Sequence, residues 1–155
     1  MSDRSRATIT IYDCPQSKQR AVVDLLNENG FAEEWLSDQE VSSPLRLGEE
    51  YVAGEVSVGS CGEIGPELAT LGATFELWQD PVYEWDGDIY IHVPSLGSFQ
   101  GSCDANGTIH VSVAEVDRIL DEVDSLESAT AALHDATGKR FRDVVRAMAA
   151  GRRPA

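Results

Sequence analysis

Residues 7–30 read ATITIYDCPQSKQRAVVDLLNENG and combine a strand pattern with a helix pattern. From Ala7 to Tyr12, threonine alternates with alanine or isoleucine, a period of two that is typical of a half-buried strand. Pro15 suits the first turn of a helix, and Gly30 is a residue that commonly ends one. The stretch therefore predicts a strand followed by an amphipathic helix that packs against it.

The rest of the chain continues to alternate strand and helix patterns. Asp86-Gly87 and Asn106-Gly107 are dipeptides that type I′ turns require, so each is expected at the centre of a β-hairpin. Ser112 and Glu115 form a Ser-x-x-Glu capping box that opens a helix. The expected strands are 50–58, 74–78 and a short one near Trp35 and Leu36, and the expected later helices are a short one around Pro66, then 113–126, 125–136 and 139–149.

This order of elements predicts an α+β fold. Its first part, β-α-β-β-α-β, matches the split βαβ arrangement of ferredoxin-like folds. The two hairpins would extend that sheet as an antiparallel meander, with helices packed on one face and further helices at the C-terminus. We expect residues 1–150 to form a single domain and residues 151–155 to be a frayed tail.

Composition indicates a globular protein of the cytoplasm. Hydrophobic residues make up 42% of the chain and charged residues 25%, close to the globular average. The sequence contains no apolar run of the roughly 20 residues that a membrane-spanning helix needs, and residues 1–13 lack the apolar core of a secretory signal. Three cysteines, an odd number without framework spacing, fit a reducing compartment.

The net charge of −15 is unevenly distributed along the chain. Residues 31–138 hold two arginines against 22 acidic residues, a net charge of −20, whereas residues 139–155 carry a net charge of +5. Such an acidic body repels nucleic acids and anionic membranes and attracts basic partners. The basic segment 139–153 leaves open a direct contact with nucleic acid, docking on the protein's own acidic surface, or dimerisation.

The stretch PVYEWDGDIYIHVP, residues 81–94, holds aromatic and acidic side chains close together. Pairing about Asp86-Gly87 would separate Glu84 from Asp88 and leave Asp86 at a hydrated tip, where burial cannot raise its pKa for acid-base catalysis. Opposed residues share a face. The aliphatic face is expected to enter the core, and the other, which is either covered by helices or exposed to a partner, would carry Tyr83, Trp85, Asp88, Tyr90 and His92.

The second hairpin suggests one candidate catalytic or metal site. Pairing about Asn106-Gly107 would place Cys103 opposite His110, and pairing with the preceding strand would place Cys103 opposite Asp88. A thiolate, an imidazole and a carboxylate in that order could act as a nucleophile or form part of a zinc site. However, a register error of one residue would move Cys103 to the other face, and the chain lacks Cys-x-x-Cys or His-x-x-x-His spacing.

The run FELWQDPVYEWDGDIYIHVPSLGSFQGSCDANG, residues 75–107, resembles small acidic uncharacterised proteins of actinobacterial phages and plasmids. The resemblance has no catalytic motif to carry over. It implies a mobile-element context, in which a small acidic protein acts by binding or inhibiting a host or defence protein.

We therefore expect a non-enzymatic interaction protein that needs no cofactor or metal and binds a basic, nucleic-acid-binding protein. Aromatic rings and carboxylates both attract guanidinium groups. The alternatives are an enzyme or metal protein that uses Cys103, His110 and Asp88, and a nucleic-acid contact through 139–153. The expected partner-binding residues are Tyr83, Trp85, Asp86, Asp88, Tyr90, His92, Glu115, Asp117, Asp121, Glu122 and Asp124.

Overall fold

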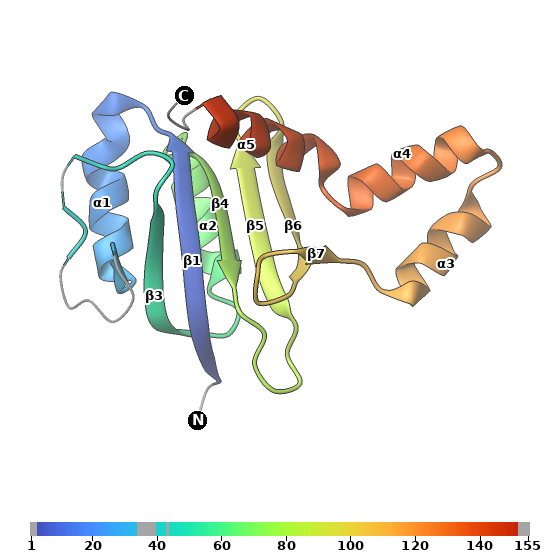
Figure 1. The fold of residues 1–155 in the computed structure, drawn as a ribbon, viewed down its shortest axis with the longest axis horizontal. Coiled ribbons are helices and arrows are strands. Elements are labelled where there is room, and N and C mark those ends of the chain that lie inside the picture. The colour runs from blue at the N-terminus through green and yellow to red at the C-terminus, as the bar shows by residue number, and fades with distance from the viewer. Residues whose placement is uncertain (1–2, 34–39, 43, 152–155) are drawn as a thin grey trace.

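The computed structural model describes residues 3–33, 40–42 and 44–151, and these residues form an antiparallel sheet with helices on both faces (Figure 1). The strand order is β2-β3-β1-β4-β5-β6-β7. The strands are β1 (Arg4–Asp13), β2 (Phe31–Ala32), β3 (Glu50–Ser57), β4 (Thr74–Gln79), β5 (Gly87–Val93), β6 (Gly97–Cys103) and β7 (Ile109–His110). The helices are α1 (Gln19–Glu28), which follows the 3-10 turn η1 (Gln16–Lys18), α2 (Cys61–Thr70), α3 (Val113–Glu122), α4 (Leu126–Ala136) and α5 (Lys139–Gly151).

The expected α+β class is confirmed, and β1 lies inside the sheet between β3 and β4. The predicted strand is present, and Ala7, Ile9 and Ile11 are all buried on one face of β1. The expectation that it is half-buried is wrong, because Thr8 and Thr10 on its other face are buried as well. Positive φ angles at Gly30 and Gly72 follow α1 and α2, as expected for glycines that end helices. The strand expected near Trp35 and Leu36 lies outside the described residues, and β2 is formed by the preceding Phe31–Ala32 instead.

The two faces of the sheet are covered by different helices. The larger core joins α1 and α2 to the face that carries Ile9, Phe75 and Tyr90. The opposite face carries Ile89 and Ile91, which pack against Val145 of α5. Figure 1 shows α5 crossing in front of β4 and β5, with α1 and α2 behind the sheet. The expectation that the helices pack on one face is therefore wrong, because α5 covers the second face.

The stretch 81–94 does not form the predicted hairpin around Asp86-Gly87. The hairpin joins β4 to β5 and pairs Gln79 with Asp88, so that Asp80–Asp86 form a loop between the two strands. Gly87 is already in β5, where a β-carbon would lie 2.6 Å from the backbone oxygen of Cys103 and 2.7 Å from that of Gln79. Only a residue without a side chain fits between these two backbones, so the Asp-Gly glycine serves strand packing rather than a turn.

The predicted registers of β6 are wrong by one residue on both sides. Cys103 pairs with Gly87 in β5 and with Ile109 in β7, rather than with Asp88 and His110. On the β7 side, the cause is the turn that follows β6. The carboxylate of Asp104 accepts hydrogen bonds from the backbone N–H groups of Asn106 (2.8 Å) and Thr108 (3.0 Å), which produces a longer turn than the two-residue type I′ turn.

Helices α3 and α4 form an arm that projects beyond the β7 edge of the sheet (Figure 1). The capping box is confirmed, since the Ser112 hydroxyl oxygen accepts a hydrogen bond from the Glu115 N–H. Within the described part of α3 and α4, Ile119 and Ala129 are buried, while Val113, Leu120 and Leu126 are exposed. We call α3 and α4 the arm. Among the described residues, no helix has both the length and the apolar character needed to cross a membrane.

Candidate functional site

The loop Asp80–Asp86 places two aromatic side chains on the surface. Tyr83 has a positive φ of 51° and a side chain that is 92% exposed. Trp85 is 52% exposed, and its indole N–H donates a hydrogen bond to the Asp3 carboxylate at 2.8 Å. Two backbone hydrogen bonds between Val82 and Trp85 (3.1 and 2.9 Å) close the loop. The indole is therefore held in one orientation while about half of it contacts solvent.

An open recess of about 720 Å³ lies beside the Trp85 ring and is lined by carboxylates. Its acidic residues are Asp3, Glu84, Asp86 and Asp88. Burial, followed by the neighbouring charge of Asp86, raises the pKa of Asp88 above its ordinary value. Gathering negative charge here is unfavourable for the free protein, and a bound cation would relieve that repulsion. We call this set of residues, together with Trp85, the acidic recess.

Two of the aromatic residues expected beside Trp85 lie elsewhere. Tyr90 is 7% exposed, and its ring stacks on Phe75 with centroids 5.8 Å apart. Its hydroxyl donates a hydrogen bond to Ser98, which also lies 2.7 Å from Nδ1 of His92. Burial lowers the pKa of His92. Tyr90 therefore belongs to the core under α2, and the single aromatic face predicted for residues 83–92 does not exist.

The candidate site of Cys103, His110 and Asp88 is not assembled. The observed registers place Asp88 and His110 on one face through Ser102, whereas Cys103 points to the other face. The Cys103 thiol is directed at the backbone oxygen of Gln79 at 3.9 Å, and burial raises its pKa to about 12. His110 instead lies 3.5 Å from the Asp104 carboxylate. A thiol with so high a pKa is a poor nucleophile.

A second recess, of about 580 Å³, connects the loop to the arm. Asp86, His110 and Glu115 all line it, so Asp86 borders both this recess and the acidic recess. Two groups of predicted partner-binding residues, far apart in sequence, therefore meet at Asp86.

The acidic residues of α3 are partly neutralised within the helix. Arg118 donates hydrogen bonds to the carboxylates of both Glu115 (2.6 and 3.0 Å) and Glu122 (2.8 Å). Its guanidinium lowers the pKa of Glu115. By contrast, the side chains of Asp117, Asp121 and Asp124 are exposed. Asp117 and Asp121 of α3 and Asp124, which follows this helix, are therefore the aspartates of the predicted acidic surface that Arg118 does not pair with.

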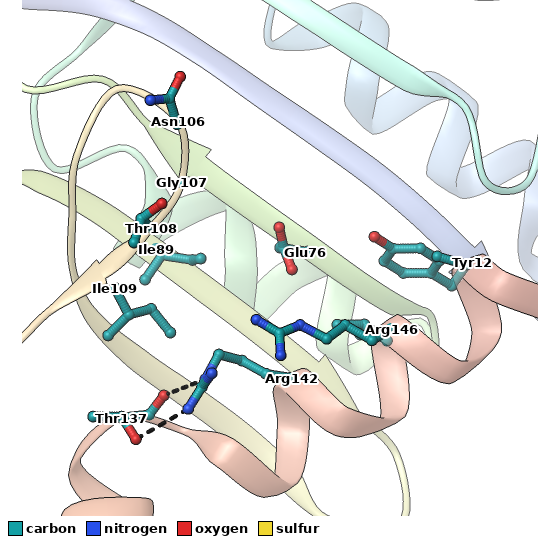
Figure 2. Close-up of a pocket in the computed structure, with 12 residues that line it drawn as sticks. Tyr12, Glu76, Ile89, Asn106, Gly107, Thr108, Ile109, Thr137, Arg142 and Arg146 are labelled. Atoms are coloured by element: carbon teal, nitrogen blue, oxygen red, sulfur yellow. Dashed lines mark hydrogen bonds between the residues drawn. The ribbon is translucent and has the colours of Figure 1, made fainter.

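Two basic residues of α5, Lys139 and Arg142, interact within the protein, whereas Arg140 and Arg146 are exposed. Lys139 forms an ion pair with Asp143, and Arg142 donates two hydrogen bonds to Thr137. Figure 2 shows Arg142 and Arg146 extending into a pocket between α5 and the sheet. This pocket was not among the sites expected from the sequence. The two-residue period of the strand expected at 74–78 was a pointer to one wall of the pocket, because it places Glu76 on the face opposite Phe75 and Leu77.

Within the described residues, no group of three or more histidine, cysteine, aspartate or glutamate side chains is arranged to hold a metal ion. The cysteines Cys14, Cys61 and Cys103 are all free thiols, and all are buried.

The comparisons with known proteins identify a family but no activity. No curated protein and no solved structure matches the chain. A family model described as a protein of unknown function (DUF3145) matches residues 21–153, a range that extends from α1 through α5 and includes the acidic recess apart from Asp3. The chain therefore belongs to the DUF3145 family.

Proposed function

We propose that this protein is a non-enzymatic interaction module that binds an arginine-rich segment of a basic protein in the acidic recess. The observation that carries the proposal is the anchored, half-exposed indole of Trp85 beside the carboxylates of Asp3, Glu84, Asp86 and Asp88. Exposed tryptophan is enriched at binding surfaces, where one part of the ring is buried by the partner.

The chemistry of the recess favours arginine over other ligands. A guanidinium group can stack on the indole face and at the same time donate hydrogen bonds to carboxylates. Nucleic acid is disfavoured, because stacking platforms for bases lie in positively charged grooves, whereas this recess holds four carboxylates. Since Asp86 also borders the recess that leads to Glu115, a longer basic segment could continue from Trp85 toward the exposed Asp117 and Asp121 of α3.

The negative charge of this protein favours one class of partner, the proteins that bind nucleic acids. Proteins that bind nucleic acids expose clusters of arginine and lysine, and an acidic protein that covers such a cluster would compete with phosphates. We propose inhibition of such a host or defence protein as the biological outcome, in the mobile-element context that the resemblance of residues 75–107 implies. Three free cysteines support a reducing, cytoplasmic location.

We also propose that the N-terminal part of the sheet is a ferredoxin-like split βαβ unit. The strand order β2-β3-β1-β4, with α1 and α2 as the connections and both on one face, supports this assignment. In this arrangement β5, β6 and β7 are additions to the β4 edge, and the acidic recess lies where the additions begin.

The direct test is binding of a short peptide of alternating arginine and glycine, measured by calorimetry over a series of salt concentrations. Trp85→Ala should weaken binding about tenfold, which corresponds to the energy of a well-placed cation–π contact. The triple variant Glu84→Gln, Asp86→Asn, Asp88→Asn should weaken it further and reduce its salt dependence.

The matched control is the triple variant Asp117→Asn, Asp121→Asn, Asp124→Asn, which removes the same charge from the arm and should weaken binding of the short peptide much less. Equal losses in the two triple variants would show that net charge alone attracts the peptide, and full binding by Trp85→Ala would contradict the proposed site. Affinity purification from the native host with wild type and Trp85→Ala would then identify the partner.

A further inference from the structure

A pocket of about 410 Å³ on the opposite side of the sheet has no part in the proposed function (Figure 2). Its walls come from three places in the chain: the sheet supplies Tyr12, Glu76 and Ile89, α5 supplies Arg142, Arg146 and Val145, and the turn after β6 supplies Asn106 and Thr108. The volume is in the range of small-molecule sites, and like those sites it combines apolar walls with a few polar groups.

The turn that covers one side of the pocket is held firmly. Hydrogen bonds to the Asp104 carboxylate fix its backbone, and Gly107 has a positive φ of 73°. A β-carbon at position 107 would lie 3.0 Å from the indole of Trp78, so the turn packs closely against the sheet. The pocket is therefore preformed rather than dependent on movement of this turn.

Arg142 is oriented by the protein before any ligand arrives. Its Nε donates a hydrogen bond to the Thr137 backbone oxygen at 2.8 Å, and its Nη2 donates one to the Thr137 hydroxyl at 3.2 Å. A guanidinium has five N–H donors, so the remaining donors are available on the side that faces the pocket. An oriented guanidinium loses little conformational entropy when it binds an anion.

Arg146 lies one helical turn further along α5 and points toward Glu76 (Figure 2). Its guanidinium forms no hydrogen bond or ion pair with any of the residues that the structure describes, although its charge does lower the pKa of Glu76. Burial has the larger, opposite effect and raises the pKa of Glu76 overall. The lining therefore holds two guanidinium groups and one carboxylate, while Asp143 and Glu50 lie close enough for their charges to act on the same groups.

The rest of the lining combines apolar side chains with the polar Asn106, Thr108 and Thr137. Ile89, Val145 and Ala149 contribute aliphatic surface, and the Tyr12 ring closes one end. Burial raises the pKa of Tyr12 to about 12, so its hydroxyl remains a neutral hydrogen-bond donor. The pocket can thus accept a molecule with one charged end and one apolar end.

We propose that this pocket binds a small organic anion, with its carboxylate or phosphate group between Arg142 and Arg146 and its apolar body against Ile89 and Val145. Two guanidinium groups on successive turns of one helix can share the oxygens of either group, and charge-assisted hydrogen bonds of this kind are the strong ones. The site is independent of the acidic recess, since the two lie on different parts of the molecule and share no lining residue.

Titrations followed by backbone amide NMR would test the site, with phenyl phosphate, benzoate and inorganic phosphate as separate probes. Phenyl phosphate, benzoate or both should give saturable shifts at Gly107, Thr108 and Arg142. The better of these two should bind at least fivefold more tightly than inorganic phosphate, because only they carry an apolar body. Which of the two binds better identifies the head group. Arg146→Gln should weaken binding about tenfold, as expected for loss of a charge-assisted hydrogen bond.

Arg140→Gln is the matched control, because Arg140 is an exposed residue of the same helix and does not line the pocket. It should leave the affinity unchanged. Equal weakening by Arg140→Gln and Arg146→Gln would show non-specific attraction and overturn the proposal. The absence of saturable shifts at these amides with millimolar phenyl phosphate and benzoate would also overturn it, as would equal binding of inorganic phosphate and both aromatic probes.

Discussion

Gly65 of α2 lies directly on the ring of Tyr90, and a β-carbon at position 65 would be 2.6 Å from Cγ of that ring. This close approach allows α2 to cover β5 and makes Tyr90 part of the core, stacked on Phe75. It also explains why the exposed aromatic surface is limited to the loop. Tyr83 and Trp85 precede the point at which the helix covers the sheet.

Replacement of Gly65 by alanine should therefore destabilise the fold. The added methyl group must displace either α2 or Tyr90, and overpacking of this kind costs about 1–3 kcal/mol. Chemical denaturation would measure the loss. Gly62→Ala is the matched control in the same helix. Its β-carbon would lie 3.5 Å from the Gln100 amide, an ordinary contact, so this variant should be neutral or slightly stabilised. Equal stability of the two variants would contradict the packing of α2 on Tyr90.

Gly138, between α4 and α5, should be sensitive to substitution for two separable reasons. It has a φ of +63°, and a β-carbon would lie 2.7 Å from the Phe99 ring. Gly30→Ala provides the control for backbone strain alone, because Gly30 has a φ of +79° with open space around it. We expect Gly30→Ala to cost about 1 kcal/mol and Gly138→Ala to cost more in thermal denaturation. Combining Gly138→Ala with Phe99→Ala should remove the excess, and additive effects of the two substitutions would show that no clash exists.

Glu76 should make stability decrease as pH rises. Burial raises its pKa in the folded protein above the ordinary 4.5, so the folded state holds the proton more tightly than the unfolded state. The resulting penalty is absent below the ordinary pKa, grows as pH rises through the folded-state pKa, and is complete above it. Glu76→Gln should therefore raise the melting temperature at neutral pH and have little effect near pH 4. A lower melting temperature at neutral pH would show that its attraction to Arg146 outweighs burial.

The three thiols should react slowly in the native protein. Burial raises the pKa of Cys14, Cys61 and Cys103 alike, with Cys103 at about 12. The thiolate is the reactive form. A disulfide reagent at pH 8 should accordingly modify the native protein far more slowly than it modifies free cysteine, and should titrate three thiols after denaturation. A fast-reacting Cys103 in the native state would restore the nucleophile hypothesis that the observed register contradicts.

The parts of the fold that depend on local pattern were predictable from sequence. The alternation in β1, the apolar stripe of α1 and the capping box of α3 each act through neighbouring residues, and all three are present. The registers were not predictable in the same way. At Gly87 the backbones of Cys103 and Gln79 leave no room for a side chain, so this glycine serves the strand rather than a turn. Gly107 does lie in a turn with a positive φ, but the Asp104 carboxylate lengthens that turn and shifts the register.

The candidate sites likewise include one that was evident in the sequence and one that was not. The acidic and aromatic composition of residues 83–88 was evident in the sequence, and the loop presents Tyr83, Trp85 and their carboxylates at the surface. The pocket under α5 was not evident, because it depends on which face of the sheet that helix covers. Arg142 and Arg146 appeared in the sequence only as part of a basic segment, whereas in the structure both line one pocket, Arg142 half-buried and Arg146 exposed at its mouth.

The arm has a consequence for the order in which the molecule opens. Within the arm α4 packs against α3, and α4 also contacts α5. The buried side chains of the two arm helices are Ile119 and Ala129. Segments with so little buried surface open locally at a small fraction of the global free energy, so their amide hydrogens should exchange with solvent well before those of β1. A partner that contacts α3 would then reveal itself first as slower exchange in the arm, while the sheet remained unchanged.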